Sequence, residues 1–172
     1  MNAMPKNPRP LPPAAAGEAV LWQVGVLPWK ITRKKGLRVL LITSRTRGRW
    51  IVPKGWPEEG RAPFMSAALE AFEEAGVIGD IHPAPLTDYR SLKIDDDGMA
   101  HPCRVTLFAM QVRGTLTHWK EQDQRKRRWF GLAEAAERLD DAELAAFVER
   151  LASAPEQLTD RAGRLPAVPA AL

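Results

Sequence analysis

Three carboxylates stand within five residues of one another in this chain, at Glu70, Glu73 and Glu74. On a regular helix, residues three and four apart are neighbours, so Glu70 would meet both of the other glutamates. Like charges at this spacing repel by about 0.2–0.5 kcal/mol per pair, a cost that a bound divalent cation would offset. Because carboxylate oxygens suit hard ions such as Mg²⁺ or Mn²⁺, the cluster indicates a metal-dependent phosphate site.

The helix that carries these glutamates is predicted to bury its other side. Apolar residues recur there at helical spacing: Phe64, Ala68, Ala71, Phe72 and Ala75. Burial of that side would turn the three carboxylates together toward solvent or a cleft. The alternative is an acidic face that does no more than solvate the helix, and the glutamates taken alone favour that alternative.

The residues around the glutamates reverse this preference. They match, in order, a signature made of a glycine, a glutamate after fourteen intervening residues, two more glutamates, a glycine and an aliphatic residue: Gly55, Glu70, Glu73, Glu74, Gly76 and Val77. With this signature the chain resembles the Nudix hydrolases. The resemblance implies the α/β class and an α/β/α sandwich with a mixed β-sheet between helices. It also implies a pyrophosphohydrolase that uses Mg²⁺ or Mn²⁺.

Two positions depart from the signature. Arg61 stands where the family has a glutamate, and Leu69 stands where it has an arginine. In the family that arginine holds the central glutamate by an ion pair, so Leu69 leaves Glu73 without its i,i+4 partner. We therefore expect reduced activity. The alternative is a catalytically weakened module that binds a polyphosphate or a nucleotide.

Two segments extend the resemblance beyond the signature. RTRGRWIVPKGWPEEG before the helix and THWKEQDQRKRRWFGLAEA near the end are similar to the diphosphoinositol polyphosphate phosphohydrolase branch. The resemblance covers residues 18–152, and the flanks 1–17 and 153–172, rich in Pro and Ala, are predicted to be extended tails. It implies hydrolysis of a diphosphoinositol polyphosphate or a dinucleoside polyphosphate. An RNA-end pyrophosphohydrolase or RNA-binding protein is a further alternative.

The chemistry requires metal and phosphate to lie together, because a diphosphate repels nucleophiles until its charge is neutralised. We expect Glu70 and Glu74 to be the principal metal ligands, with Glu73 as a further ligand or water-orienting base. The backbone carbonyl of Lys54 is expected to be a neutral ligand, and this residue also belongs to the expected substrate-binding set. The general base cannot be assigned among the three glutamates, since neighbouring carboxylates titrate together.

A row of cations precedes the signature. Arg45, Arg47 and Arg49 recur at period two, which on an extended segment would place all three side chains on one face toward phosphate. The alternative is that these arginines serve solubility.

Further substrate contacts are predicted outside this row. Arg104 begins a later strand, and Arg125 and Arg127 belong to a run of four basic residues, 125–128. Trp56 lies in the Gly-Trp-Pro turn beside the expected metal loop, where its indole could contact substrate. The three groups of cations together favour a polyanionic small molecule.

The elements that position these residues follow from apolar patterning. We predict a turn at 95–98, a second amphipathic helix over 133–151, and strands over 19–27, 37–43, 50–52, 78–92 and 104–112. Strands and helices in this order imply a sheet covered on both faces.

Composition adds little about function. The formal net charge is +4 over 172 residues, which argues neither for nor against nucleic acid. The lone Cys103 cannot form an internal disulfide, and we expect it to be buried in a strand of a cytoplasmic protein. No signal peptide is visible, and no apolar run approaches the roughly 18 residues that cross a bilayer. Oligomeric state stays open.

Overall fold

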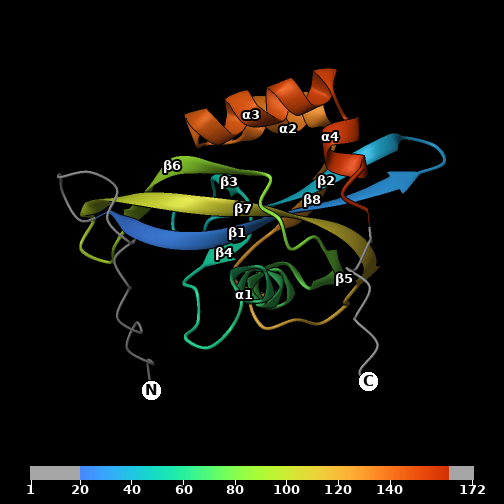
Figure 1. Cartoon of the computed structure of the whole chain (residues 1–172). Helices are drawn as coiled ribbons and strands as arrows, with labels where there is room; N and C mark the ends of the chain where they lie inside the picture. The colour runs from blue at the N-terminus through green and yellow to red at the C-terminus, as the bar shows by residue number, and fades with distance from the viewer. Residues whose placement is uncertain (1–19, 163–172) are drawn as a thin grey trace, which may run out of the picture.

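The computed structural model describes residues 20–162, which form a mixed sheet between two layers of helix (Figure 1). The strands are β1 (Leu21–Thr32), β2 (Gly36–Thr43), β3 (Trp50–Ile51), β4 (Lys54–Gly55), β5 (Val77–Ile81), β6 (Thr87–Ile94), β7 (Ala100–Thr115) and β8 (Arg127–Phe130). The α-helices are α1 (Pro63–Glu70), α2 (Leu132–Arg138), α3 (Ala142–Ser153) and α4 (Glu156–Thr159), and a π-helical turn, η1 (Ala71–Ala75), continues α1.

Strands β1 and β7 form the centre of the sheet and run parallel, with Leu21 opposite Cys103. The other strand pairs are antiparallel. Strand β1 changes partners along its length: Val24 and Gly25 pair with β4, and the part from Trp29 onward pairs with β2. On the other side, β6 and β5 share one edge of β7. The short β4 thereby brings the loop before α1 against the middle of the sheet.

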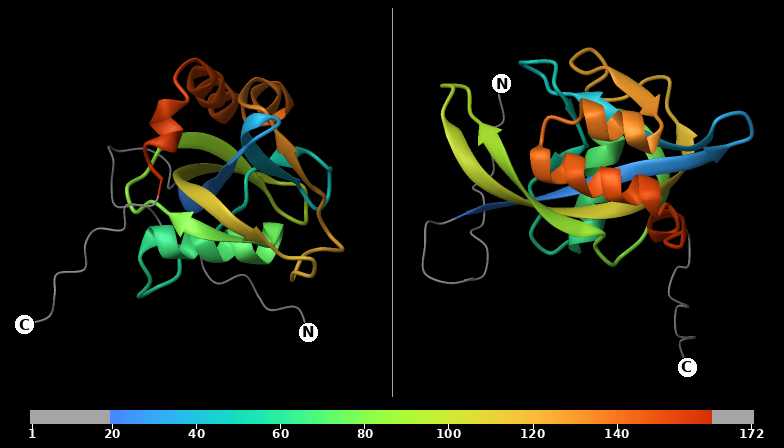
Figure 2. Two further views of the ribbon diagram at one scale, coloured as in Figure 1. Left: turned by 90° about the vertical axis from the view of Figure 1, so that its right-hand side faces the viewer. Right: turned by 90° about the horizontal axis from the view of Figure 1, so that it is seen from above.

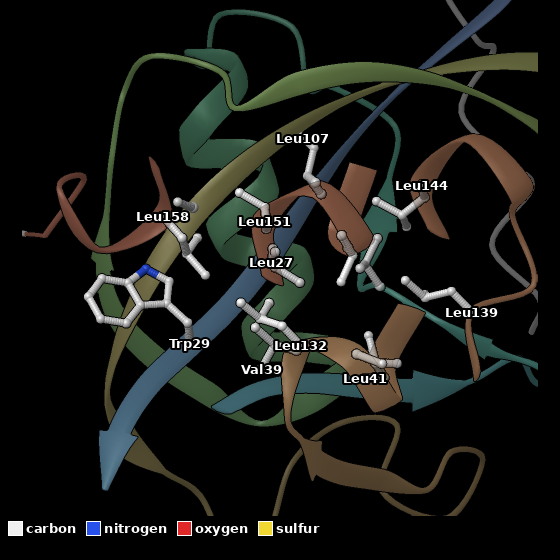
Figure 3. Packing of buried hydrophobic residues seen from close by; sticks show 14 of the residues in the cluster. Leu27, Trp29, Val39, Leu41, Leu107, Leu132, Leu139, Leu144, Leu151 and Leu158 are labelled. Carbon is white, nitrogen blue, oxygen red and sulfur yellow. The ribbon is translucent and has the colours of Figure 1, made fainter. Parts of the chain in front are cut away.

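The two faces of the sheet bury two separate apolar clusters, because side chains alternate along a strand. In β1, Val24 and Val26 pack with Ala67 and Ala71 of the α1 layer. Leu27 and Trp29 point the other way and pack under α2 and α3 (Figure 3). Figure 2 shows α2 and α3 side by side across that face. The predicted α/β/α sandwich with a mixed sheet is therefore confirmed.

The strand predicted over 78–92 is two strands. β5 ends at Ile81 and β6 begins at Thr87, and between them lies the sequence His-Pro-Ala-Pro-Leu. Proline lacks the N–H that a ladder requires, so Pro83 and Pro85 interrupt the pairing. The predicted turn at 95–98 is confirmed: Gly98 has a φ of 81°, and its N–H donates to the carbonyl of Asp95.

The second helix, predicted over 133–151, is also interrupted. α2 ends at Arg138, and α3 begins after Asp141. The N–H of Asp140 instead donates to the carbonyl of Trp50 at 3.1 Å, which ties this connection to β3. Periodicity alone could not predict the break, because the bond that replaces the helical one comes from a distant strand.

The predicted C-terminal boundary at residue 152 is too early. α3 reaches Ser153, and in α4 the side chain of Leu158 is 0 % exposed within the cluster under α2 and α3. The guanidinium of Arg161 donates to the carbonyls of Ala84 and Pro85. The tails predicted over 1–17 and beyond residue 162 lie outside the described residues. Within 20–162, no helix is long and apolar enough to cross a membrane.

Candidate active site

The helix that carries the glutamates is not regular. α1 ends at Glu70, and the chain continues as a π-helical turn, in which the N–H of Gly76 reaches the carbonyl of Ala71. A π turn holds more residues than an α turn, and such turns are frequent at functional sites. The extra residue changes which side chains share a face. Phe72, predicted to be buried, is 44 % exposed, so that prediction is wrong.

Glycines fix both ends of this segment. Gly76 ends the π turn with a φ of 61°, a left-handed conformation that favours glycine. Gly55 lies in β4 against the side chain of Glu70, and a β-carbon at residue 55 would collide with that carboxyl group. The signature glycine therefore allows the loop backbone to approach the first signature glutamate closely.

Glu70 and Glu74 form a carboxyl pair, joined by a hydrogen bond between their side chains. The Glu74 side chain is buried, with the residue 6 % exposed, and the backbone N–H of Lys54 lies 3.5 Å from its Oε2. Arg125 lies on the other side of Glu74, with its Nη2 at 3.5 Å from Oε1. Two carboxyl groups from one helix thus meet at the β4 loop.

Burial makes this pair retain protons. The pKa of Glu74 is raised from 4.5 to about 8, chiefly by desolvation and also by the charges of Glu70 and Glu121, against the opposing effect of Arg125. Desolvation, with the charge of Glu73, raises the pKa of Glu70 to about 7. At neutral pH the pair therefore carries fewer than two negative charges. Because its oxygens are hard donors that lack full counter-charge, the pair fits a divalent cation of the Mg²⁺ type.

Glu73 does not join the other two glutamates as predicted. Its Oε2 lies 3.3 Å from Nζ of Lys120, which comes from the loop between β7 and β8. Within residues 20–162, no three His, Cys, Asp or Glu side chains are gathered as around a metal ion. The charge of Glu73 still raises the pKa of Glu70, so the two carboxylates are close enough to interact. The role of Glu73 as a further ligand or base stays a prediction. Leu69 indeed provides no cation, and Lys120 stands beside Glu73 instead.

Sequence reasoning missed a fourth carboxylate, Glu121. Its Oε1 lies 3.3 Å from Nε of Arg125 and 3.9 Å from Nη1 of Arg45. Its charge raises the pKa of both Glu70 and Glu74. We call Glu70, Glu74, Glu121 and Arg125 the carboxylate cluster. The local sequence does not distinguish Glu121 from a solvated glutamate. Its position depends on a contact distant in sequence, the hydrogen bond from its backbone N–H to the carbonyl of Glu73.

Lys93 on β6 was also missed. Its pKa is lowered by burial and by the positive charges of Arg45, Lys54 and Arg125, while the charge of Glu74 opposes this effect. Cations from four distant segments are therefore close enough to interact, and the charge of Glu74 reaches Lys93 among them. Such a concentration of positive charge is suited to a polyphosphate.

The side chain of Lys54 reaches away from the carboxylates to the other face of the sheet. Its Nζ donates to Oγ of Ser91 at 3.2 Å, and that hydroxyl donates to Oδ1 of Asp141 at 2.6 Å. Lys54 thus touches Glu74 through its backbone and α3 through Ser91. Its carbonyl as a metal ligand stays a prediction.

The predicted row of arginines does not exist. Residues 45–47 form a turn, closed by the N–H of Gly48 on the carbonyl of Ser44 at 3.2 Å. Arg45 points toward Glu121, Arg47 is exposed on the turn, and Arg49 pairs with Asp140 at 2.9 Å. Period two requires an extended segment, and glycine at residue 48, with a φ of 63°, favours the turn. Their roles as substrate contacts stay predictions.

The basic run divides between two structural settings. The Arg125 side chain is 8 % exposed and lies inside the carboxylate cluster. Arg127 donates to the carbonyls of Ala75, Gly76 and Leu116, and its guanidinium lies 3.8 Å from the ring centre of Trp119. These bonds occupy the guanidinium at the end of the π turn. Its role as a substrate contact stays a prediction.

Two residues predicted to bind substrate, Arg104 and Trp56, do not touch the carboxylate cluster among the contacts seen within residues 20–162. Arg104 on β7 pairs across the strands with Asp88 of β6 at 3.3 Å. Trp56 is half-buried in the loop after β4. Neither position decides whether the residue touches substrate, and both stay predictions. Cys103, by contrast, is buried in β7 as predicted, and burial raises the pKa of its thiol to about 11.

The fold and the site define a class of protein. An α/β/α sandwich presents two carboxyls, Glu70 and the buried Glu74, on a helix against a glycine loop, with cations from that loop and from three other segments. Residues 21–151 match the NUDIX domain. The chain therefore belongs to the NUDIX family.

The curated relatives include plant and animal proteins. Nudix hydrolase 13, mitochondrial, of Arabidopsis thaliana is 38% identical over 106 residues, which cover 59% of this chain and 52% of the relative. Diphosphoinositol polyphosphate phosphohydrolase 3-alpha of Mus musculus is 32% identical, with 56% of each chain covered. The chain spans about half the length of the curated relatives it matches.

Solved structures resemble the fold. An Ap4A hydrolase of C. elegans has a TM-score of 0.56 at 18% identity, with 79% of this chain and 98% of that chain covered. The NUDIX domain of Shewanella oneidensis NrtR, solved with ADP ribose, also has a TM-score of 0.56, at 19% identity, with 78% and 90% covered. At these identities the likeness concerns the fold alone.

Proposed function

We propose that this chain is a divalent-metal-dependent hydrolase that cleaves a phosphoanhydride bond in a small polyphosphate compound. The observation that carries the proposal is the carboxyl pair of the half-buried Glu70 and the buried Glu74, held against the β4 loop with raised pKa values. Two carboxyls with raised pKa values destabilise the folded state when both are ionised, unless a positive charge lies beside them. Mg²⁺ or Mn²⁺ is the cation that suits such oxygens.

Each residue of the site has a distinct task in this proposal. Glu70 and Glu74 hold the cation, which when bound neutralises phosphate oxygens and makes water more acidic. Arg125 and the other converging cations bind and orient the phosphates. Glu73 stays the candidate for a further ligand or a base, once its carboxylate leaves Lys120. In this proposal, water is activated beside Glu70 and Glu74, where the bound phosphates would lie.

Two substrate classes are supported by comparison. Relatives that align with this chain are named diphosphoinositol polyphosphate phosphohydrolases, and a neighbour in fold is named an Ap4A hydrolase. We therefore propose a diphosphoinositol polyphosphate or a dinucleoside polyphosphate as substrate. The basic run gives the RNA alternative less support than its composition suggests, because Arg125 and Arg127 face the protein and only Lys126 and Arg128 are exposed.

A weakened, polyphosphate-binding module is the second candidate. It is favoured by one contact, the ion pair between Glu73 and Lys120, which occupies a carboxylate expected to serve the metal or the water. In that case the pocket would bind the same ligands without appreciable turnover.

The test is a turnover assay on both substrate classes with Mg²⁺, Mn²⁺ or a chelator. Wild type is compared with Glu70→Gln and Glu74→Gln, and with Glu149→Gln on the exposed side of α3 as the matched control. The proposal expects metal-dependent release of phosphate or nucleotide that both site variants abolish and the control retains. Binding without turnover in wild type would instead select the binding module.

The compartment is proposed on weaker grounds. The free, buried Cys103 suits a reducing compartment such as the cytoplasm. Several relatives carry the word mitochondrial in their names, so localisation of the tagged full chain is the measurement that decides between the two.

A further inference from the structure

The β1–β2 hairpin concentrates positive charge away from the carboxylate cluster. Figure 2 shows this hairpin extending beyond the helices at one end of the sheet. Residues 30–38 contain five basic residues and no acidic one, so this segment alone carries more charge than the formal net charge of +4 of the whole chain. Like charges gathered in this way repel one another, so an anion that joined them would stabilise the hairpin.

A cavity of about 210 Å³ lies in this hairpin, and we call it the hairpin pocket. Its lining residues are Lys30, Thr32, Lys35, Arg38 and Trp129. Lys30 and Arg38 lie opposite each other in the register of β1 and β2, and like charges directly opposite on two antiparallel strands are destabilising. The pocket therefore holds two cations in register, with a third cation, Lys35, at the turn.

The three cations of the pocket form no ion pair within residues 20–162. Other exposed arginines of the described chain are paired, such as Arg90 with Glu143 at 2.6 Å and Arg113 with Asp80 at 2.7 Å. Nε of Arg38 is buried and has no hydrogen-bond partner among the described residues. Because a buried charged donor without a partner is costly, an anion beside the Arg38 guanidinium would stabilise the folded chain.

Neighbouring groups position the cations of the pocket. Nζ of Lys30 lies 4.0 Å from the ring centre of Trp129, a cation–π contact that orients the ammonium group without a carboxylate. The backbone N–H of Lys35 donates to Oγ1 of Thr32 at 3.1 Å, which fixes the turn. The hairpin backbone and the Trp129 ring therefore hold the cations in place before any anion binds.

We infer that the hairpin pocket binds a phosphate group and is a second anion site, separate from the carboxylate cluster. Guanidinium and ammonium groups without partners are the donors that phosphate oxygens accept. The volume lies below the range of about 300–1,000 Å³ for drug-sized ligands, so the pocket suits a compact ligand such as a phosphate monoester or a diphosphate. The Lys30 ammonium covers a face of the Trp129 ring, which leaves that face unavailable for stacking on a base.

The inference goes beyond the proposed function and does not require the chain to hydrolyse any substrate. Its test is a calorimetric titration of the full chain with inorganic pyrophosphate in chelator, so that no metal-dependent turnover occurs. A salt concentration of about 0.15 M screens attraction beyond roughly 8 Å and leaves direct contacts. Lys30→Met and Arg38→Met should each bind pyrophosphate at least about tenfold more weakly than wild type, because each loses a charge-assisted hydrogen bond.

Two further variants serve as controls. Lys34→Met removes an exposed cation of the same hairpin that does not line the pocket, so the affinity should change less than about twofold. Lys93→Met removes a cation near the carboxylate cluster and should keep the hairpin site. Lys30→Met and Arg38→Met relieve the repulsion between the two strands, so neither should lower the melting temperature followed by circular dichroism.

Three results would overturn the inference. Equal weakening in Lys34→Met would mean that only diffuse charge attracts the anion. Weakening in Lys93→Met, with none in Lys30→Met and Arg38→Met, would mean that pyrophosphate binds at the carboxylate cluster. Wild type that binds no pyrophosphate, but binds a single-stranded oligonucleotide through Lys30 and Arg38, would make the hairpin a nucleic-acid surface instead. The turnover assay above tests the hydrolase separately from all three.

Discussion

The carboxylate cluster and the cavity lined by Ser91, Leu92, Ile94, Pro102 and Cys103 differ in how their charges are balanced. At the cluster, the pKa values of Glu70 and Glu74 are raised, and cations from distant segments converge nearby. In the cavity wall, each lining arginine pairs with a carboxylate, and much of the remaining surface is apolar. The difference shows that raised carboxyl pKa values gather at the cluster, as they often do at functional sites.

This division explains why the cluster is the costlier region. Buried carboxyls lose hydration that only a partner or a proton replaces, whereas surface ion pairs such as Arg90 with Glu143 contribute little in either direction. Residues with strongly shifted pKa values are found most often at functional sites. Substitutions at the cluster should therefore affect chemistry more than substitutions in the cavity wall.

The largest effect should come from Gly55→Ala. A β-carbon there collides with the carboxyl group of Glu70, so the carboxyl pair must move away from the β4 loop. Misplacement of a catalytic group by about 1 Å can cost roughly 100-fold in rate, and we expect kcat to fall by that order in a steady-state assay. Gly131→Ala is the control, because its β-carbon would meet only Arg38, at an ordinary 3.5 Å. Comparable losses in both variants would contradict the account.

Lys93→Met should sharpen the contrast between the regions. Removal of this cation from the group around the cluster should raise KM for inorganic tripolyphosphate about tenfold, the value of one charge-assisted hydrogen bond. Lys34→Met, in the exposed turn between β1 and β2, is the control. A KM that does not change would remove Lys93 from the phosphate site.

The pH dependence of folding should report the carboxyl pair. The folded-state pKa of Glu74, about 8, lies above its ordinary value of 4.5. Between these values the folded chain binds more protons than the unfolded chain, so the stabilising contribution is present below pH 4.5 and is lost as pH rises through 8. Urea unfolding in chelator from pH 5 to 9 should therefore show stability declining. Glu74→Gln should flatten that decline, and an equally steep decline would contradict the assignment.

The smallest effect is expected from Leu69→Arg. An arginine four residues before Glu73 would give it an intrahelical partner worth about 0.5 kcal/mol, so kcat should rise about twofold with KM nearly unchanged. The π turn and the contact with Lys120 limit the gain. Leu69→Met controls for side-chain volume. A rate that is flat or lower would mean that Leu69 does not restrain activity.

Sequence reasoning succeeded where local pattern and structure coincide. The signature identified the segment that carries Glu70 and Glu74, and the order of strands and helices predicted the sandwich. It could not predict the π turn, because that turn depends on which carbonyl Gly76 reaches. It also missed Lys93, whose importance arises only when β6 lies beside the β4 loop.

The arginines show the same limit of sequence reasoning, because their pattern predicted an arrangement that the fold does not contain. Arg45, Arg47 and Arg49 have a period that would suit a strand, yet a turn separates their side chains. The guanidinium of Arg127 is a group that often binds phosphate, yet here it donates hydrogen bonds to three backbone carbonyls. Residue spacing predicts which side chains share a face only where the secondary structure is regular. A charged residue predicts a ligand site only where its side chain is not already bound to the protein.

Direct metal binding tests the central claim most closely. Mn²⁺ titrated into the full chain at pH 8, and followed by electron paramagnetic resonance, should bind to wild type and to Glu149→Gln alike. Glu74→Gln should bind at least about tenfold more weakly, because one of the two ligands is lost. If Glu74→Gln binds Mn²⁺ as tightly as wild type, the carboxyl pair is not the metal site and the account is contradicted.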